Sequence, residues 1–282
     1  MSAEKNVLIS GTSSGLGRAA AVAFARKGWR VYAGMRDTTQ GTGLLDEAGP
    51  VADRITVVQL DLLSQDSIHK AVEFVLGDCG DRLDLLLNNA GSAASGFFEV
   101  QPDADFRSVM ETNFFGTCAL TREVLPAMRE RRSGRVMTVT SVAAYAASPA
   151  LSAYVASKRA LQGWMESLAV ETRLFGISVA VVEPGTYRTA IWENAKRTEG
   201  GPDSPYERLH ERFEDSARRL VEVSGREPEV GAKAIVALAD RKRIPFRNPV
   251  GLDARWFFRP LGVVPFRLRA RMIGRFSGVG AE

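Results

Sequence analysis

The sequence contains few of the residues from which disulfide frameworks and metal sites are built. Its 282 residues include only two cysteines, Cys79 and Cys118, and only two histidines, His69 and His210. Two cysteines without a CxxC pair argue against a disulfide scaffold and suit a reducing cytosol, so we expect a cytoplasmic protein. The cysteines and histidines form no cluster suited to zinc, and we expect no metal site.

Long hydrophobic runs and targeting segments are also missing. No uninterrupted apolar stretch is long enough to span a bilayer, and the polar residues 1–6 lead directly into a predicted strand without a signal peptide. The sequence shows no linker, low-complexity segment or internal repeat, and its hydrophobic content of 45% is sufficient for a substantial core. We therefore expect a single domain over residues 1–282.

The charge of the chain is distributed unevenly. The net charge is +4, but residues 241–282 hold ten Lys/Arg against Asp253 and Glu282, a local balance of +8 that leaves −4 for residues 1–240. The basic excess therefore belongs to the C-terminal tail. Because no nucleic-acid-binding module surrounds it, we expect no nucleic-acid partner.

Short apolar runs alternate with longer amphipathic segments along the chain. The predicted strands are Lys5–Ser10, Arg30–Met35, Ile55–Leu60, Leu83–Leu87, Arg135–Thr140 and Ile177–Val182. The predicted helices are Leu16–Gly28, Ser67–Leu76, Asp103–Arg129 with interruptions around Gly116 and Pro126, and Ser152–Leu174. Strands that are apolar on both faces and alternate with helices predict a doubly wound, Rossmann-type parallel sheet with helices on both faces. Ligands of such sheets bind at the carboxyl ends of the strands.

Three glycines, Gly11, Gly15 and Gly17, lie between the first predicted strand and its helix. A tight turn there brings backbone amides close to a pyrophosphate, and the start of a helix favours negative charge. The spacing is GxxxGxG rather than the GxGxxG of larger dehydrogenases. A purely structural turn is the alternative, but the position between strand and helix favours a nucleotide.

The residues after the second strand indicate which cofactor binds. Many NAD enzymes place a carboxylate there for the ribose 2′-hydroxyl, whereas this chain has Met35 followed by Arg36. A guanidinium suits a 2′-phosphate, so we predict NADP(H) ahead of NAD(H). Two alternatives remain open: Asp37 can still reach the ribose, and Arg36 can be a solvated loop charge. Further along the chain, Asp61 with Leu62 is a candidate adenine contact.

A tyrosine and a lysine, Tyr154 and Lys158, are four residues apart in the last predicted helix and therefore share one face. A neighbouring ammonium favours the phenolate and lowers the pKa of the phenol, so Tyr154 can exchange a proton with a carbonyl or alcohol oxygen. Ser141, at the end of the fifth strand, can hold the same oxygen. Asn113 is a poor residue for the middle of a helix, and a water held near Lys158 would explain it.

In combination these motifs resemble the short-chain dehydrogenase/reductase family, of its compact TGxxxGxG type. The likeness covers about residues 6–190 and rests on Ser10–Gly17, Asp61, Asn88-Asn89-Ala90-Gly91, Asn113, Ser141, Tyr154, Lys158 and Pro184-Gly185 with Thr189. Ser10 stands where a threonine is usual, and because a hydroxyl is kept we expect little effect. The strand end VYAGMRD and the long tail are loosely similar to the hydroxysteroid and retinol dehydrogenase branch.

The resemblance implies about seven strands in the order 3-2-1-4-5-6-7, a C-terminal helical extension and a homodimer or homotetramer. It implies proton transfer by Tyr154, a Lys158 that also holds the nicotinamide ribose, and a nicotinamide bordered by residues 184–189. The cofactor contacts it predicts are Gly11, Ser13, Ser14, Gly15, Leu16, Gly17, Arg36, Asp61, Leu62, Asn88, Ala90, Gly91, Tyr154, Lys158, Pro184, Gly185, Thr186 and Thr189.

The substrate side is less regular than the cofactor side. Residues 187–225 are rich in charge and predict a lid with a helix over Tyr206–Val223. The predicted pocket residues are mostly apolar and favour a lipophilic carbonyl or secondary alcohol: Ala93, Val142, Ala144, Ser148, Tyr187 and Trp192. The basic and aromatic extension, about 251–282, can pack on a subunit, cover the pocket or touch an acidic membrane surface.

Two other functions fit parts of the sequence. A nucleotide-sensing or regulatory protein could keep the cofactor fold, but it would not require Ser141, Tyr154, Lys158 and Asn113 together. A dehydratase or epimerase of the extended branch is disfavoured by the GxxxGxG spacing and the short substrate region. The sequence therefore predicts an NADP(H)-dependent oxidoreductase.

Overall fold

The computed structural model describes residues 4–198 and 203–279. Residues 1–3, residues 199–202 of the predicted lid (Pro202 among them) and the last three residues of the extension lie outside the described part of the chain.

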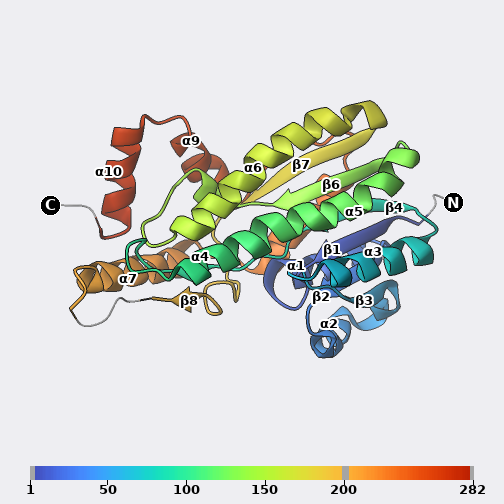
Figure 1. Ribbon diagram of the computed structural model, residues 1–282, viewed down its shortest axis with the longest axis horizontal. Coiled ribbons are helices and arrows are strands. Elements are labelled where there is room, and N and C mark those ends of the chain that lie inside the picture. Colours follow the sequence, from blue (N-terminus) through green and yellow to red (C-terminus); the bar gives the residue numbers. More distant parts are fainter. Residues whose placement is uncertain (1–3, 199–202, 280–282) are drawn as a thin grey trace.

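The centre of the protein is one parallel sheet of seven strands (Figure 1). In chain order these are β1 (Asn6–Ser10), β2 (Arg30–Met35), β3 (Ile55–Gln59), β4 (Leu83–Asn88), β6 (Gly134–Val139), β7 (Ile177–Pro184) and β9 (Arg247–Val250). They lie side by side as β3-β2-β1-β4-β6-β7-β9. Counted along these seven strands alone, this is the predicted order 3-2-1-4-5-6-7, so the predicted fold is confirmed.

Helices cover both faces of the sheet, as the strand composition predicted. On one face α1 (Gly15–Arg26), α2 (Gly41–Ala48) and α8 (Pro228–Ala239) share a core with Val7 and Ile9 of β1. On the other face α3 (Gln65–Cys79), α5 (Gly116–Glu130) and α6 (Ser152–Thr172) share a core with Leu8. Successive residues of a strand point to opposite faces, which explains why fully apolar strands need two helical layers.

Three elements differ from the prediction. The seventh strand, β9, has the sequence RNPV; its Pro249 is tolerated because β9 is the edge strand beside β7. Between α4 (Asp103–Met110) and α5 the chain forms a π-helical turn, η3 (Glu111–Phe115), directly before Gly116. The interruption predicted at Pro126 is wrong, because Pro126 lies inside α5 on its exposed side, where water can reach the carbonyl that lacks a donor.

The lid and the extension lie at the end of the molecule opposite the N-terminus (Figure 1). The lid contains α7 (Glu207–Ser224), close to the helix predicted over 206–223, and β8 (Lys196–Arg197), which pairs with β5 (Ala94–Ser95). The extension contains a π-helical turn, η6 (Ala254–Phe258), then α9 (Arg259–Leu261) and α10 (Phe266–Phe276). Among the described residues no helix is both long and apolar enough to cross a membrane.

Candidate active site

A cavity of about 1760 Å³ opens along the carboxyl ends of the strands. Its walls come from the glycine loop, from the ends of β2, β3, β4, β6 and β7, from α7 and from the extension. The parallel sheet therefore brings together motifs that are up to 180 residues apart in the sequence, as expected for a doubly wound fold.

The glycine loop has a shape that side chains would fill. Gly11 has φ +73°, and a Cβ on it would lie 2.6 Å from the Cα of Ala90. A Cβ on Gly17 would lie 2.2 Å from the carbonyl oxygen of Gly11. Gly15 has φ +56° and faces Thr189, whose Cβ would be 3.3 Å away. The bare backbone at the start of α1 thus fits a pyrophosphate, and Ser13, Ser14 and Leu16 line the cavity beside it.

The hydroxyl at position 10 joins the glycine loop to the end of β4. Ser10 Oγ accepts hydrogen bonds from the backbone amides of Asn89 and Ala90, both at 3.1 Å. The side-chain Nδ2 of Asn89 in turn donates to the carbonyl oxygens of Ser10 and Gly11 at 3.1 and 3.0 Å. Serine at this position therefore makes the contacts that require a hydroxyl.

Asn88 lies elsewhere than predicted. Its side chain is 2% exposed and donates to Thr121 Oγ1 at 2.9 Å and Thr138 Oγ1 at 3.2 Å, below the cavity. It does not line the cavity, whereas Asn89, Ala90 and Gly91 do. Alternation along β4 explains the difference, since neighbouring residues at a strand end point in opposite directions.

At the far end of the cofactor cleft, Arg36 is exposed and lines the cavity with Asp61 and Leu62. The carboxylate of Asp37 instead caps the turn after β2, where Oδ1 accepts from the amide of Thr39 at 3.0 Å and from its hydroxyl at 2.6 Å. These bonds lower the pKa of Asp37, the hydroxyl having the largest effect. Asp61 forms a similar turn, since Oδ1 accepts from the amide of Leu63 at 3.0 Å.

Tyr154, Lys158 and Ser141 meet at the middle of the cavity. Tyr154 and Lys158 lie on one face of α6 and are only 6% and 3% exposed. The Nζ of Lys158 lies 5.6 Å from the centre of the Tyr154 ring and donates to the carbonyl oxygen of Val139 at 3.0 Å. Ser141 follows β6, where its Oγ accepts from the amide of Ala143 at 3.1 Å.

Burial shifts the two ionisable groups of α6 in opposite directions. It raises the pKa of Tyr154 to about 12, against which a hydrogen bond with the Ser141 hydroxyl acts. Burial also lowers the pKa of Lys158 to about 8. The lowered tyrosine pKa that the neighbouring ammonium was expected to produce is not seen in this structure, because desolvation disfavours both charged forms.

Asn113 acts from behind the cavity wall. It occupies the π-helical turn, is fully buried, and accepts from the amide of Ser92 at 2.7 Å. Its amide donates to the carbonyl oxygen of Ser92 and to Ser157 Oγ, both at 2.9 Å. A Cβ on Gly91 would lie 3.4 Å from Asn113 Oδ1 and 3.5 Å from Lys158 Nζ. Asn113 thus joins the loop after β4 to α6, the helix that carries Tyr154 and Lys158.

Five of the six predicted substrate residues line the cavity: Ala93, Val142, Ser148, Tyr187 and Trp192. The Trp192 ring packs edge-on against Tyr154 at 5.2 Å. Ala144 does not line the cavity; its carbonyl accepts from Arg159 Nε at 2.9 Å. The ring of Tyr187 packs near Leu16 and Gly231, at the cofactor end. Pro184, Gly185, Thr186 and Thr189 line the wall between the two ends.

The sequence reasoning missed Asp253, which comes from the extension. Its Oδ2 accepts from the amide of Thr186 at 2.6 Å, and a Cβ on Gly185 would lie 2.2 Å from its Oδ1. The extension therefore fixes the loop that follows β7. A signal was present, because Asp253 is the one acidic residue between residues 241 and 281.

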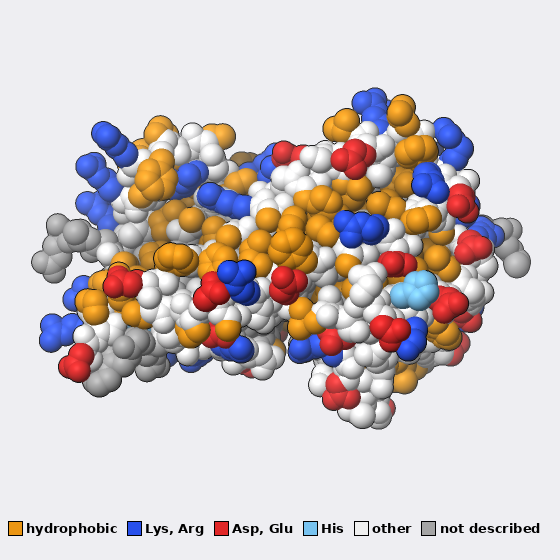
Figure 2. All heavy atoms as spheres, viewed as in Figure 1, with side chains coloured by type: hydrophobic (Ala, Val, Ile, Leu, Met, Phe, Trp, Pro, Cys, Tyr) orange, Lys and Arg blue, Asp and Glu red, His pale blue; other side chains and the backbone are white. Residues whose placement is uncertain are grey.

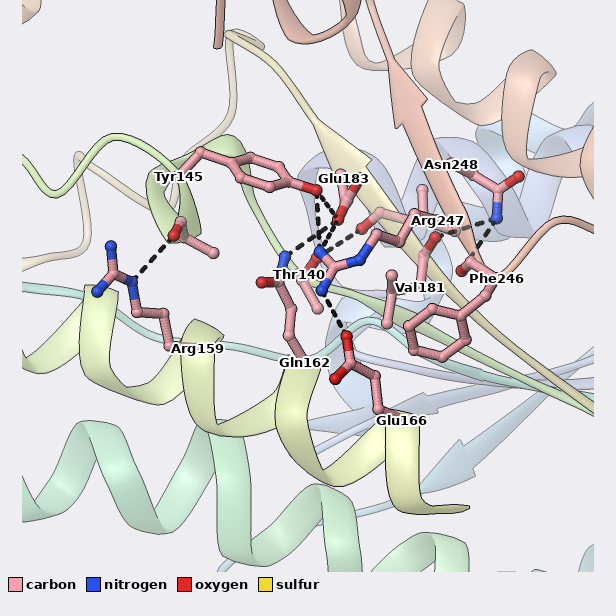
Figure 3. Close-up of polar contacts among 12 residues, drawn as sticks. Thr140, Tyr145, Arg159, Gln162, Glu166, Val181, Glu183, Phe246, Arg247 and Asn248 are labelled. Carbon is pink, nitrogen blue, oxygen red and sulfur yellow. Dashed lines mark hydrogen bonds and ion pairs between the residues drawn. The ribbon is translucent and has the colours of Figure 1, made fainter. Parts of the chain in front are cut away.

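A second missed carboxylate, Glu183, is fully buried at the end of β7 (Figure 3). Its Oε1 accepts from Tyr145, from Gln162 Nε2 at 3.0 Å and from Arg247 of β9 at 3.1 Å. Burial and the bond to Glu183 raise the pKa of Tyr145 to about 12. Arg247 also reaches Glu166 of α6 at 2.6 Å. The network holds β7, β9 and α6 together next to Pro184, below the cavity.

Comparisons with known proteins agree with this geometry. The family model described as short chain dehydrogenase matches residues 5–200. The chain is 36% identical over 254 residues to the uncharacterized oxidoreductase YusZ of Bacillus subtilis, covering 88% of this chain and 89% of the other. It is 34% identical over 261 residues to human retinol dehydrogenase 8, covering 89% and 82%. A short-chain dehydrogenase of Streptomyces avermitilis superposes with a TM-score of 0.80 at 35% identity, covering 92% of both chains.

The motifs and their spacing, the seven-stranded order, the cradle at the start of α1 and the match over two thirds of the sequence lead to the same result. The chain belongs to the short-chain dehydrogenase family of NAD(P)-dependent oxidoreductases.

Proposed function

We propose that the protein is an NADP(H)-dependent oxidoreductase that interconverts a lipophilic carbonyl compound and its alcohol. The observation that carries this proposal is the place of Tyr154. Its hydroxyl lies with Ser141 and Lys158 where the polar strand ends meet an apolar outer cavity, formed by Trp192, Phe213 and the residues around them.

The chain's own residues supply the proton chemistry. When bound, the nicotinamide supplies or accepts the hydride. In the reductive direction Tyr154 donates its proton to the carbonyl oxygen, and Ser141 holds that oxygen by a hydrogen bond. A buried tyrosine with a raised pKa stays protonated until an oxyanion forms beside it. Lys158, whose pKa is lowered to about 8, can exchange a proton near neutrality and stabilise the phenolate that remains.

The preference for NADP(H) is supported by the residues after β2. Arg36 faces the cavity, and none of the described residues holds its guanidinium by a hydrogen bond or ion pair. Asp37, which could have bound a ribose 2′-hydroxyl, is occupied by Thr39. A guanidinium without a competing carboxylate favours a 2′-phosphate.

The lipophilic substrate is supported by the cavity and by the relatives. Apolar side chains of the lid and extension, among them Trp192, Phe213, Phe258 and Leu261, line the outer cavity beside charged ones such as Glu214 and Arg218. Among the relatives are proteins named retinol dehydrogenase 8 and 3-ketodihydrosphingosine reductase, the second from Bacteroides thetaiotaomicron at 31% identity over 251 residues, 87% of each chain. Both names refer to molecules with long hydrocarbon parts.

The test is to titrate NADPH and NADH by fluorescence and then to assay lipophilic ketones and aldehydes with wild type and Tyr154→Phe. We expect tighter binding of NADPH and a loss of turnover of about 10³-fold in Tyr154→Phe, with cofactor affinity kept. Tyr206→Phe is the matched control, since Tyr206 contacts Glu99 and does not line the cavity. Tight cofactor binding without turnover on any substrate would favour the sensing protein instead.

We further propose one catalytic domain with residues 187–225 as its lid, assembled as a homodimer or homotetramer. Apolar side chains exposed on and beside α5 and α6 support self-association: Phe115 is 52% exposed, Val170 76% and Leu174 79%. Light scattering on wild type and Val170→Asp tests this, because an apolar self-contact would bury the unpaired carboxylate of each copy. A cytoplasmic location stays a prediction.

A further inference from the structure

The extension exposes more large hydrophobic side chains than any other segment of similar length in the described chain. It carries seven of the sixteen large hydrophobic side chains that the described residues expose: Leu252, Trp256, Phe257, Val263, Phe266, Leu268 and Phe276. Trp256 is 74% exposed, Val263 88% and Phe266 72%. A contiguous set of this kind marks an interaction surface.

The same segment is strongly basic. Six arginines lie between residues 254 and 279, where the sequence has no acidic residue: Arg255, Arg259, Arg267, Arg269, Arg271 and Arg275. Within the described parts of the chain none of the six forms an ion pair. Figure 2 shows Lys and Arg side chains beside hydrophobic ones at the end of the molecule where Figure 1 places α10. This charge complements an anionic surface.

The exposed surface has an uncharged apolar segment at its centre, which we call the tip, with arginines on both sides of it in the sequence. The segment 260–266, PLGVVPF, joins α9 to α10 and has no charged residue, whereas Arg259 and Arg267 stand directly before and after it. Val263 and Phe266 project from this segment into solvent. An apolar tip flanked by arginines matches the depth profile of a lipid interface, with apolar groups below the headgroups and guanidinium groups at the phosphates.

The inner side of the extension lines the cavity and packs against α7. Met272, Ile273 and Phe276 of α10 line the cavity together with Phe258 and Leu261. A Cβ on Gly278 would lie 3.1 Å from Cβ of Arg212, so the end of α10 packs against α7. The segment that carries the exposed apolar side chains therefore also forms part of the wall of the cavity that Tyr154 lines.

We propose that the α9–α10 hairpin docks on an anionic phospholipid bilayer and places the mouth of the cavity at the lipid surface. A second copy of the chain is a poorer occupant, because a symmetric contact would set like-charged arginines against each other. The idea that a substrate enters the cavity from the bilayer rests on the proposed function. The docking itself does not.

The experiment is co-sedimentation of the full chain with vesicles of phosphatidylcholine alone or mixed with phosphatidylglycerol. Wild type is expected to bind the mixed vesicles, more weakly at high salt. Trp256→Ser/Phe266→Ser and Arg267→Gln/Arg271→Gln are each expected to weaken binding about tenfold or more. The matched controls are Phe74→Ser on α3 (Phe74 is 49% exposed) and Arg241→Gln/Arg243→Gln. Neither control should change vesicle binding.

Absent binding to the mixed vesicles, or equal losses in variants and controls, would overturn the proposal. The proposal would also be overturned if the wild type did not bind vesicles and Trp256→Ser/Phe266→Ser changed the mass of the assembly in solution. That result would assign the surface to contact with a second copy. NADPH titration of the same variants is the control for folding: unchanged cofactor binding shows that a variant has an intact fold. A loss of vesicle binding then reports on the docking surface alone. Vesicle binding without any turnover would contradict the proposed function and leave the docking standing.

Discussion

At the scale of single residues, the burial of Tyr154 and Lys158 lowers the stability of the fold. Tyr154 and Lys158 are both nearly inaccessible to water, and burial shifts each pKa toward the neutral form. A buried lysine without a carboxylate partner costs free energy as long as it stays protonated. The position keeps Lys158 near a neutral working pKa at the expense of folding stability.

Lys158→Met should therefore raise the free energy of unfolding at pH 7, by about 2 kcal/mol once the lost bond to Val139 is subtracted. Below the folded pKa of about 8 both states of wild type hold the proton, so the full penalty is present. Between a pH of about 8 and the unfolded pKa near 10.5, only the unfolded state binds the lysine proton, so the stability of the wild type rises with pH. The stability advantage of the variant therefore shrinks over this pH range. Urea unfolding at pH 7 and pH 9.5 measures this, with exposed Lys70→Met as control; equal gains at both pH values would contradict it.

The position of Arg36 at the cofactor end of the cavity leads to a prediction about cofactor preference. Arg36→Asp should lower NADPH affinity by about 10- to 100-fold, the effect of losing a charge-assisted bond to the 2′-phosphate, and should improve NADH binding. Fluorescence titration of both cofactors gives the ratio. Lys27→Gln, which removes an exposed charge at the end of α1 away from the cavity, is the control. An unchanged cofactor ratio would show that Arg36 is not the selector.

Residue identity and spacing were sufficient to predict that Tyr154, Lys158 and Ser141 lie at one cavity. Local rules fix their geometry, because residues four apart share one face of a helix and Ser141 follows directly after a strand. Identity and spacing were not sufficient to choose between Asn88 and Asn89. Strand alternation decides which amide faces the cavity, and a one-residue error in register exchanges the two. Asp253 was out of reach for a different reason, since its contact with Thr186 spans 67 residues.

At the scale of elements, the end of β7 depends on a neighbour that the sequence pattern does not reveal. Glu183 is fully buried and Arg247, 30% exposed, is its cationic partner across β7 and β9. Arg247→Ala should lower the free energy of unfolding by about 2 kcal/mol, less than for a fully buried pair because water reaches the arginine. Chemical denaturation measures the loss. Glu166→Ala, which removes only the partner that is 54% exposed, should cost less than about 1 kcal/mol. Equal losses would show that burial of Glu183 is not the cause.

Elements with a strong period were predicted to within a few residues, and those without one were not. The six predicted strands were found because burial on both faces leaves a mainly hydrophobic run in each. β9 was not located, because an edge strand of four residues with Pro249 has neither a run nor an alternation. The π-helical turn at Asn113 was expected as ordinary helix, since nothing in the local sequence shows that Ser92 and Ser157 will hold this side chain.

At the scale of the whole molecule, one cavity connects three regions of different character. The cofactor end is made of backbone and small residues, and the centre holds the buried Tyr154 and Lys158. The outer end belongs to the lid and the extension, which contribute an apolar cluster around Trp192 and Phe213. The first two follow from the parallel sheet, which any sequence of this pattern would form. The outer end depends on the residues after 187. The sequence predicted helices there, but it did not predict how those helices pack against the cavity.

This division predicts that the outer wall can be changed without disturbing the inner end. Met272→Ser/Ile273→Ser removes apolar wall from α10, and a missing apolar contact costs a bound hydrocarbon about 1–3 kcal/mol. We expect kcat/KM for a long-chain ketone to fall about tenfold or more, while NADPH affinity and kcat/KM for a small ketone stay within about twofold. Ala270→Ser, on the exposed side of the same helix, is the control. If both substrates lost activity equally, the extension would act on the whole site, through Asp253 and Thr186, rather than as a wall for the hydrocarbon.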